Sequence, residues 1–588
     1  MRSTSSRLSV RYGYRLRLAL SLLDSRERSK LVALVGVRAG VGLCDLLLAG
    51  AMYLVFVRLQ GSMPRQHFAW MPRTTLSAAI VTAILVVLRS VADVASTRAV
   101  TTYVQAINNR LLMRLAQGYS EMDWRCFMAR NRSELLNHTT YTAREASHFY
   151  HRGVELISAS LTIVMMTVAL VYQNASAAFA LALVIGALYV AHRFLIRRQL
   201  QAAGGAREEA TQRLQKILAD VFSSGKEIRA YGNQAFFLRR INEQAQRVAA
   251  STVRVTLLPQ VARIVTDQGV ALLFLGVVIA VQLRHVEVSQ LLSLLVFYFV
   301  LSRRLIPLIS QVSFIAGQME GSYENVRLAS KELKTCALHR VESAPIALPV
   351  DGMVMELNHV TFSFDAGLPV LRDIELRHPS GELIVVHGAS GAGKSSLLNI
   401  IAGVLQPDGG IVCVDQNKLA YVPQDITMLD DSVRNNLLFG LAGKGDAVLM
   451  DALAMAELDG LVASQAEGLD SQVGDNGILF SGGQRQRFGL ARAILRGATL
   501  LLLDEATSAL DEENEARVLI NLRRRNVAVL LVTHRTRAQL FADRVFTLHD
   551  GRLFEELPQV NPFLAQAFRA TFMPQTSGAH WDKAVTKR

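Results

Sequence analysis

Residues 388–395 read GASGAGKS, which fits the pattern GxxxxGK[ST]. The apolar segment Leu383–Val386 precedes this pattern as a strand, and Ser396–Ile401 begins a helix after it. The glycines let backbone N–H groups approach phosphate oxygens, and the positive end of the helix dipole favours an anion at the same place. The stretch therefore predicts a nucleotide-binding domain of the α/β P-loop class.

Two side chains of this loop can act on the nucleotide directly. Lys394 can neutralise the oxygens of the β- and γ-phosphates, and the Ser395 hydroxyl can coordinate Mg²⁺. ATP and Mg²⁺ are therefore the expected cofactors. The residues predicted to hold the nucleotide in this stretch are Gly388, Ser390, Gly391, Gly393, Lys394, Ser395 and Ser396.

A second buried strand is predicted at Leu500–Leu503, and two carboxylates, Asp504 and Glu505, follow it. At the end of such a strand a carboxylate can reach a metal-bound phosphate. We assign Asp504 to Mg²⁺ and Glu505 to the attacking water, because Asp504 cannot serve as general base while it holds the metal.

The sequence FSGGQ at residues 480–484 resembles the signature of ATP-binding cassette proteins, in which the first residue is Leu instead of Phe480. The departure leaves the phosphate-contacting Ser481, Gly482 and Gly483 unchanged, and we expect it to be tolerated. Gln484 is assigned to the nucleotide site with them.

The resemblance covers essentially the whole chain and implies further roles. Phe364 matches the aromatic residue that stacks on adenine, and Gln424 in Tyr-Val-Pro-Gln matches the loop that senses the metal and contributes to it. Asp511 closes the D-loop, and His534 matches the switch histidine beside the γ-phosphate. The alternative for His534 is a surface imidazole at a strand end.

In this family the signature of one cassette closes on the phosphate loop of another, so the resemblance implies a dimer. Because Glu505 and the signature motif are both intact, a homodimer is favoured, and pairing with a related half-transporter is the alternative.

The composition indicates a membrane protein. The chain has 588 residues, of which 51% are hydrophobic, and a mean hydropathy of +0.26. Six apolar stretches are predicted to span a bilayer, the last two being short. They are residues 31–57, 76–94, 154–172, 175–195, 270–283 and 288–301.

Together with the resemblance, the spans imply a multidomain fold class, with an all-α six-helix transmembrane domain of the type I ABC exporter fold and an α/β P-loop cassette. The six spans argue against a soluble ATPase that acts on DNA or ribosomes. The predicted boundaries are a cytoplasmic lead-in at 1–30, the transmembrane domain at 31–330, a linker at 331–352, the cassette at 353–557 and a basic tail at 558–588.

The long polar connections 95–153 and 196–269 are predicted to be helices that extend into the cytoplasm. Within them, Glu121–Arg130 and Gly225–Phe236 match the coupling helices of exporters, which should contact the Gln424 loop and residues 473–477. Alternatively, Trp124 and Phe127 are ordinary core aromatics of the helix bundle.

The formal net charge of +14 does not predict nucleic-acid binding, because Lys and Arg flank the apolar stretches as the positive-inside rule requires. The four cysteines are far apart and show no metal-binding spacing.

Ionisable residues inside spans are functional candidates by default. Arg38 and Asp45 lie seven residues apart on one face of the first span, and Arg89 and Asp93 lie four apart in the second, so each couple could also be a self-neutralising pair. Snorkelling to the headgroups is the simpler explanation for arginines near span ends. The candidates for the substrate pathway are Arg38, Asp45, Arg89, Arg263 and Arg304.

Arg89, Arg263 and Arg304 together could line a positive cavity for a phosphate or pyrophosphate headgroup. The segment lengths also resemble the flippases of lipid-linked oligosaccharides in bacterial inner membranes, where we expect this protein to lie. The predicted function is ATP-driven export or flipping of such an anionic lipid. Export of a peptide, a drug or a siderophore-like molecule is the alternative.

Overall fold

The structure, a computed structural model, describes residues 15–59, 74–173, 179, 199, 202–207, 209–283, 288–341, 347–364, 369–441, 443–474, 477–508 and 510–556, and some helical residues by backbone alone. Two compact units are present. One comprises Met1–Ser120 and Asn131–Leu338, and the other comprises Glu121–Arg130 and His339–Arg588.

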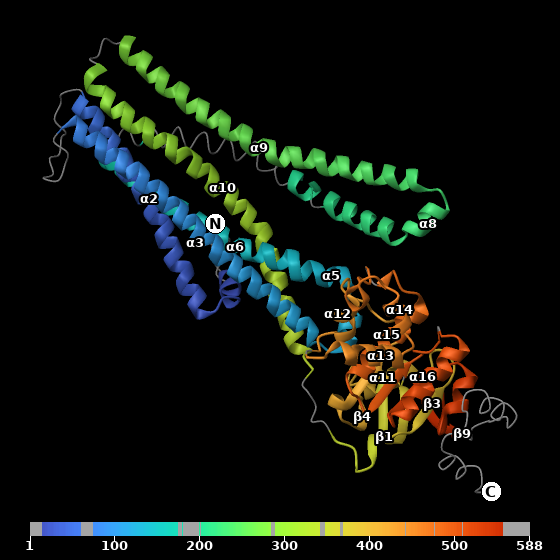
Figure 1. The fold of residues 1–588 in the computed structure, drawn as a ribbon. Coiled ribbons are helices and arrows are strands. Elements are labelled where there is room, and N and C mark those ends of the chain that lie inside the picture. The colour runs from blue at the N-terminus through green and yellow to red at the C-terminus, as the bar shows by residue number, and fades with distance from the viewer. Residues whose placement is uncertain are drawn as a thin grey trace, which may run out of the picture. The chain divides into compact units, whose positions relative to one another are not determined.

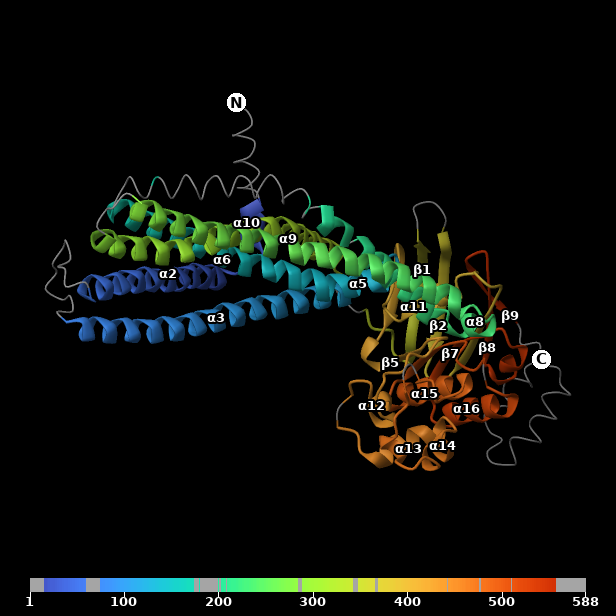
Figure 2. The ribbon, with the colours of Figure 1, turned by 90° about the horizontal axis from the view of Figure 1, so that it is seen from above.

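The first unit is helical. Its long helices are α2 (Ser25–Leu59), α3 (Thr75–Ser120), α6 (Ala143–Gln173), α9 (Gln234–Leu283) and α10 (Val288–Leu338). Helices α2, α3, α6 and α10 lie side by side in both Figure 1 and Figure 2. The shorter elements are α5 (Arg132–Asn137), a π-helix (His138–Thr142) and α8 (Gly225–Ala230).

Three stretches of the described residues are long and apolar enough to cross a membrane: Ser25–Leu59, Thr75–Ser120 and Arg132–Tyr172. They contain the first three predicted spans. The fourth prediction, 175–195, lies outside the described residues apart from residue 179, and the last two fall within α9 and α10. Only 11% and 6% of the apolar windows of the first two helices are buried, so most of their apolar surface faces outward.

Helix α10 continues through Lys331–Leu338, which we predicted as the start of the linker. This part contains no Gly or Pro to end a helix, and it packs against α3. A Cβ added to Gly118 of α3 would lie 2.9 Å from Cβ of the buried Cys336. The close packing of α3 on α10 therefore keeps the segment helical, and the division between the two units falls after Leu338.

The charged residues of the first two spans pair between helices, not within each helix as one of the two alternatives had it. Arg38 of α2 lies 2.8 Å from Asp93 of α3. In the other pair Nε of Arg89 in α3 lies 2.5 Å from Oδ1 of Asp45 in α2. The Arg38 guanidinium also donates to the Ser96 hydroxyl at 2.8 Å. Spacing along one helix indicates a shared face, but it does not show which neighbouring helix supplies the counter-charge.

The second unit contains two sheets. Strands β1 (Met353–Ser363), β2 (Pro369–Pro379) and β4 (Gly409–Val414) form an antiparallel sheet in the order β2-β1-β4. The larger sheet has the order β5-β6-β7-β3-β8-β9. Its strands are β3 (Leu383–His387), β5 (Leu419–Val422), β6 (Leu500–Asp504), β7 (Ala528–Val532), β8 (Arg544–His549) and β9 (Arg552–Glu556). Only β9 is antiparallel to its neighbour.

The larger sheet is buried on both faces, as its continuous apolar strands require. Val385 packs in one core with α15 (Gly482–Leu495) and α16 (Glu512–Arg524), whereas Val386 packs in the other core with α11 (Lys394–Ile401) and the antiparallel sheet. Smaller helices, α12 (Val433–Leu438), α13 (Asp446–Met455) and α14 (Asp459–Ala463), cover the first core. Alternate residues of one strand thus pack into the cores on opposite faces of the sheet. The ends of the strands remain available for a ligand site.

Residues Glu121–Arg130, with the short helix α4 (Trp124–Met128), belong to the cassette unit. The Asp123 amide donates to the carbonyl of His339 at 2.8 Å, and the Arg125 guanidinium lies 5.3 Å from the centre of the Phe362 ring. Trp124 is 38% exposed, so it is not a core aromatic of the helix bundle. These contacts attach the predicted coupling segment to the β1 end of the cassette, beside the predicted adenine residue.

Candidate ATP site

The candidate site lies at the carboxyl edge of the larger sheet, where four neighbouring parallel strands end. Gln424 follows β5, Glu505 follows β6, His534 follows β7 and the phosphate loop follows β3. Carboxyl ends of parallel strands meet at one edge, which is the usual place for a ligand in α/β sheets. The sheet order therefore brings together four segments that are far apart in the sequence.

The phosphate loop needs glycine at two places. Gly388 has a φ of 155°, and a Cβ there would lie 2.4 Å from the carbonyl oxygen of Leu548. Gly393, at the N-cap of α11, has a φ of 101° and would place a Cβ 2.9 Å from the Val370 side chain. Only a residue without a side chain fits these positions, so the loop can wrap closely around a phosphate. The predicted Ser390, Gly391, Ser395 and Ser396 lie in this loop and in the first turn of α11.

Lys394 is buried, with 6% of the residue exposed, and its ammonium group points back into the loop. It donates to the carbonyl oxygens of Gly388 and Ala389, at 2.9 and 2.8 Å. Burial lowers the pKa of Lys394, and the negative charges of Glu505 and Asp504 oppose that change. The cation is thus held inside the loop that would surround the phosphates, with carboxylates close by.

Asp504, the last residue of β6, is 5% exposed. Burial raises the pKa of its carboxyl group, whereas the hydroxyls of Ser395 and Tyr421 stabilise the charged form. Tyr421 donates to Oδ2 at 3.3 Å. A buried carboxylate beside the Ser395 hydroxyl offers the hard oxygen ligands that Mg²⁺ prefers.

Glu505 is the centre of a hydrogen-bonded group. Its Oε2 accepts from Nε2 of Gln424 at 3.0 Å, and its Oε1 lies 2.9 Å from Nε2 of His534. The backbone has a φ of 49°, which is uncommon for a residue with a side chain, and the Glu505 amide donates to the carbonyl of Val532 at 2.9 Å. The backbone and two neighbouring loops therefore orient the carboxylate together.

Three residues that the sequence analysis did not single out support this group. Gln486 donates to the Glu505 carbonyl at 3.3 Å and to the Ser508 hydroxyl at 3.1 Å. Tyr421 binds Asp504, and Arg535 donates to the carbonyls of Ser508 and Leu510. Each stands within three residues of a motif residue, at Arg485-Gln-Arg487, Tyr-Val-Pro-Gln and His534. Their closeness in sequence to the motif residues is the feature from which these three residues could have been predicted.

The signature forms the start of α15. Ser481 is the N-cap and makes a capping box with Gln484, in which the Ser481 amide donates to Oε1 of Gln484 at 2.8 Å. Ser481 and Gly482 are exposed, and Gly483 is half-buried. In the described part of this chain, no hydrogen bond or ion pair joins Ser481–Gln484 to the phosphate loop. The two predicted halves of the nucleotide site thus have no direct polar link within one chain.

The Phe480 side chain is 4% exposed and packs against Phe488, with ring centres 6.0 Å apart. It lies in the core that includes α15 and α16 rather than on the exposed surface of the signature. The departure from leucine therefore changes core packing and leaves the exposed signature backbone free.

Two other predicted site residues stand apart from the Glu505 group. Phe364 is 54% exposed, and its ring meets that of Phe362 at 4.9 Å between centres. The Asp511 carboxylate caps α16 by accepting from the Asn514 amide at 2.8 Å. The side chains of Arg263 and Arg304 lie outside the described residues, although their backbones belong to α9 and α10.

A phosphate loop, a carboxylate oriented by two loops and a signature helix define the ATPase of an ATP-binding cassette, and the helical unit adds apolar helices of membrane-spanning length. The ABC transporter family matches residues 371–508, and the ABC transporter transmembrane region matches residues 41–305.

The curated relatives include the ATP-dependent lipid A-core flippase of Cupriavidus pinatubonensis, which is 28% identical over 72% of this chain and 80% of its own length. The protein of the same name from Burkholderia thailandensis is 27% identical over 79% of this chain and 82% of its own. A solved bacterial Atm1-family ABC exporter with ATP bound has a TM-score of 0.69 and 18% identity, over 94% of this chain and 99% of that one.

The chain belongs to the ABC transporter family and has the type I exporter fold. It is an ATPase coupled to transport across a membrane, and it carries one transmembrane domain and one cassette.

Proposed function

We propose that two copies of this chain form a flippase that uses ATP to move an anionic lipid, such as lipid A-core or a lipid-linked oligosaccharide, across a bacterial inner membrane. The observation that supports this most is the similarity to lipid A-core flippases, which extends over both domains.

At the catalytic end, Glu505 is the general base that orients and deprotonates water at the γ-phosphate. Its two carboxylate oxygens are already held by Gln424 and His534, so the base does not need to reorganise when the nucleotide arrives. Lys394 stabilises charge on the phosphates from inside the loop. This arrangement suits phosphoryl transfer, in which positioning and electrostatics supply most of the catalysis.

Ser395, Gln424 and Asp504 would hold Mg²⁺. They supply a hydroxyl, an amide oxygen and a buried carboxylate, which are the hard oxygen ligands that this cation requires. The bound ion would neutralise charge on the β- and γ-phosphates.

The dimer is proposed because the signature and the phosphate loop have no direct polar link within one chain. Ser481 and Gly482 are exposed at the N-terminus of the 14-residue helix α15. The dipole of this helix favours a phosphate group of the ATP that is bound to the phosphate loop of a second copy. Pairing with a related half-transporter would use the same surface.

For the substrate pathway, Arg263 and Arg304 are the candidates that we retain. Arg89 and Arg38 are paired with Asp45 and Asp93, so these four residues hold α2 and α3 together instead of offering a free charge to a headgroup.

The test is ATP-dependent translocation of fluorescent lipid A-core and of a lipid-pyrophosphate-linked oligosaccharide in proteoliposomes. Wild-type protein should move at least one of them, and Glu505→Gln should move neither. Intact ATPase activity without movement of either lipid would reject the lipid substrate and favour a peptide or a small amphiphile.

A further inference from the structure

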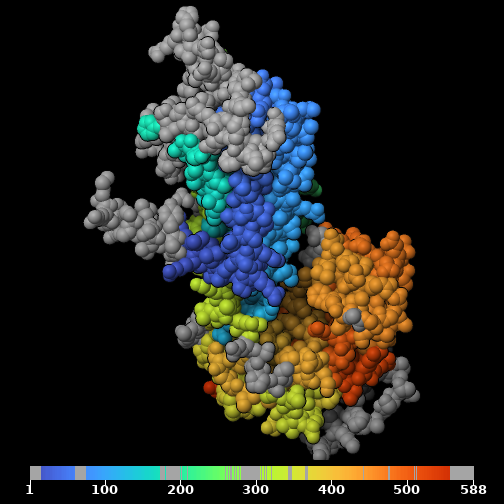
Figure 3. Space-filling view, turned by 90° about the vertical axis from the view of Figure 1, so that its left-hand side faces the viewer, coloured from blue at the N-terminus to red at the C-terminus, as the bar shows by residue number. Residues whose placement is uncertain are grey.

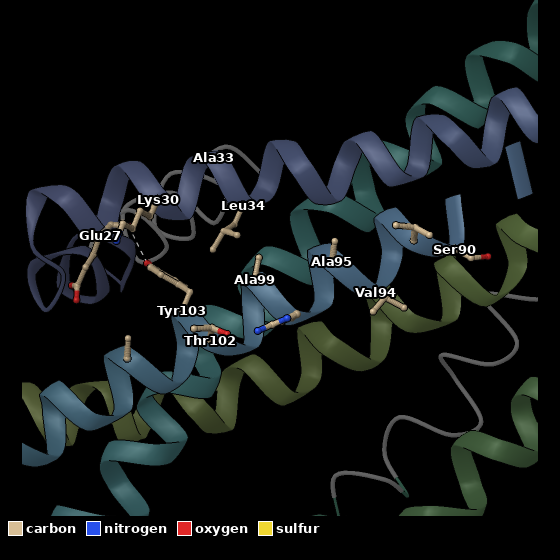
Figure 4. Close-up of a pocket in the computed structure, with 13 residues that line it drawn as sticks. Glu27, Lys30, Ala33, Leu34, Ser90, Val94, Ala95, Ala99, Thr102 and Tyr103 are labelled. Carbon is tan, nitrogen blue, oxygen red and sulfur yellow. Dashed lines mark hydrogen bonds between the residues drawn. The ribbon is translucent and has the colours of Figure 1, made fainter. Parts of the chain in front are cut away.

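A pocket of about 1040 Å³ lies between α2 and α3 of the helical unit (Figure 4). It is as large as the upper range of pockets that hold small ligands. Its lining changes character along the helices. In Figure 4 Lys30 and Tyr103 lie at one end and Val94 lies toward the other, with Leu34 between them. Arg98 and Val91 of α3 also line the pocket.

The pocket lining carries two positive charges, those of Lys30 and Arg98. Lys30 and Arg98 are exposed, and among the described residues no carboxylate oxygen lies within 4.0 Å of either cationic group. The nearby Glu27 does not serve them, because its Oε2 lies 2.7 Å from the Arg110 guanidinium. Tyr103 is also engaged, since its hydroxyl donates to the Glu27 carbonyl at 3.0 Å. Two cations from two helices therefore face one space.

The other end is apolar and open to the surroundings of the helices. Val91 is 61% exposed and Val94 is 71% exposed. Figure 3 shows the surfaces of α2 and α3 next to each other on one face of the helical unit, α2 in blue and α3 in lighter blue. Exposed apolar side chains on a spanning helix contact acyl chains, so this end of the pocket opens toward lipid.

The polar end lies on the cytoplasmic side. Helix α3 leads from Val91 through Arg98 to Ser120 and then directly into Glu121–Arg130, which belongs to the cassette unit. Lys30 lies near the start of α2, after the basic residues of the lead-in, as expected for a cytoplasmic segment. The basic residues would then lie at the depth of the lipid headgroups, and the apolar residues would lie toward the membrane centre. This arrangement matches a lipid with an anionic headgroup and apolar acyl chains.

We propose that this pocket binds a phospholipid of the cytoplasmic leaflet with an anionic headgroup. The phosphate lies between Lys30 and Arg98, and an acyl chain lies along Leu34, Val91 and Val94. The charge of the pocket selects an anionic over a zwitterionic headgroup, because each basic residue near the surface favours anionic lipid. The proposal does not depend on which molecule is transported.

The experiment measures lipid binding to the delipidated full-length protein in detergent by native mass spectrometry, without ATP or transport substrate. The probes are phosphatidylglycerol and phosphatidylcholine. Wild type should bind phosphatidylglycerol more tightly, and the double variant Lys30→Ala, Arg98→Ala should bind it roughly 30-fold more weakly, from two lost basic contacts. Phosphatidylcholine binding should change little.

The matched control is Arg26→Ala with Arg114→Ala, which removes the same charge from the same two helices outside the pocket. It should keep the preference for phosphatidylglycerol. Ala99→Trp fills the pocket without changing charge and should reduce binding of both lipids.

Equal phosphatidylglycerol affinity in the Lys30→Ala, Arg98→Ala variant and in wild type would overturn the proposal, as would an equal loss in the control. One-for-one displacement of phosphatidylglycerol by lipid A-core would also overturn it, because the pocket would then be a substrate site. The binding measurement uses neither ATP nor transport. A negative result in the flipping assay would therefore reject the proposed flippase activity without affecting the proposed phospholipid site.

Discussion

Nε2 of His534 lies 2.9 Å from Oε1 of Glu505, although the two residues follow different strands. They meet because β6 and β7 are parallel neighbours, paired from Leu500 with Ala528 to Asp504 with Val532. Gln424 reaches the other oxygen of the same carboxylate from the end of β5. The Glu505 carboxylate is therefore the point at which three strand ends meet.

Glu505→Gln should reduce ATP hydrolysis by roughly 10²- to 10⁴-fold, because the amide keeps the shape of the side chain but cannot take a proton from water. Binding of ATP should remain close to that of wild type. Phosphate release and binding of a fluorescent nucleotide check the two effects. Glu513→Gln, on the exposed side of α16, is the control and should be fully active. Normal hydrolysis in Glu505→Gln would show that another group is the base.

Tyr421→Phe should weaken the dependence of the site on Mg²⁺ without blocking catalysis. The variant loses the hydroxyl that donates to Oδ2 of Asp504 at 3.3 Å, a contact that contributes about 1 kcal/mol. The Mg²⁺ concentration that gives half-maximal ATPase activity should rise by about fivefold. The rate at saturating Mg²⁺ should be unchanged, and a chelator should abolish activity in both proteins. An unaltered Mg²⁺ titration would contradict the role of Tyr421.

Asp45→Ala should destabilise the helical unit by about 2–4 kcal/mol, because Arg89 is left partly buried without its counter-charge. The exchange Asp45→Arg with Arg89→Asp should restore more than half of that loss. Thermal unfolding of the purified protein in detergent measures both effects. Strictly additive losses in the double variant would mean that the two side chains do not interact.

His378 should make the cassette sensitive to acid. It is fully buried and donates from Nε2 to the Glu382 carbonyl at 3.0 Å, and burial lowers its pKa to about 4. The unfolded chain takes up the proton near pH 6.5, so stability from the neutral ring is complete above that pH and is lost as the pH falls to about 4, by about 3 kcal/mol.

The corresponding measurement is denaturant unfolding at pH 7.5 and at pH values from about 6.5 down to 4. His378→Gln should remove part of the acid sensitivity, because glutamine does not titrate. His549→Gln, at an exposed histidine, should behave as wild type does. An unchanged pH profile in His378→Gln would contradict the assignment.

Phe480→Leu should change the free energy of unfolding by less than about 1.5 kcal/mol and should retain ATPase activity, because one buried apolar side chain replaces another. Phe480→Ala should lose about 3–5 kcal/mol through the cavity it leaves beside Phe488. Thermal unfolding and phosphate release test both variants. A severe loss of activity in a stable Phe480→Leu protein would show that the residue acts on the nucleotide.

Features that depend on local patterns were predictable from the amino-acid sequence alone. The phosphate loop at 388–395 requires glycine and lysine at set spacings, and a buried strand such as Leu500–Leu503 requires a continuous apolar run. Each can therefore be recognised from its own residues, without knowledge of the residues that it contacts in the fold. The long helical extensions were also predictable, because the polar connections 95–153 and 196–269 contain few Gly and Pro residues.

The contacts between distant residues, in contrast, follow from the packing of helices and strands against one another. Spacing placed Arg38 and Asp45 on one face of a helix, but the packing of α2 against α3 chose Asp93 and Arg89 as their partners. Helix α10 ends at Leu338, later than predicted. Close packing of its last turns on Gly118 of α3 stabilises a helical segment where the polar sequence had indicated a linker. Gln486, Tyr421 and Arg535 gained their contacts from strand order and loop geometry. These choices depend on contacts between residues far apart in the chain, and no local pattern contains them.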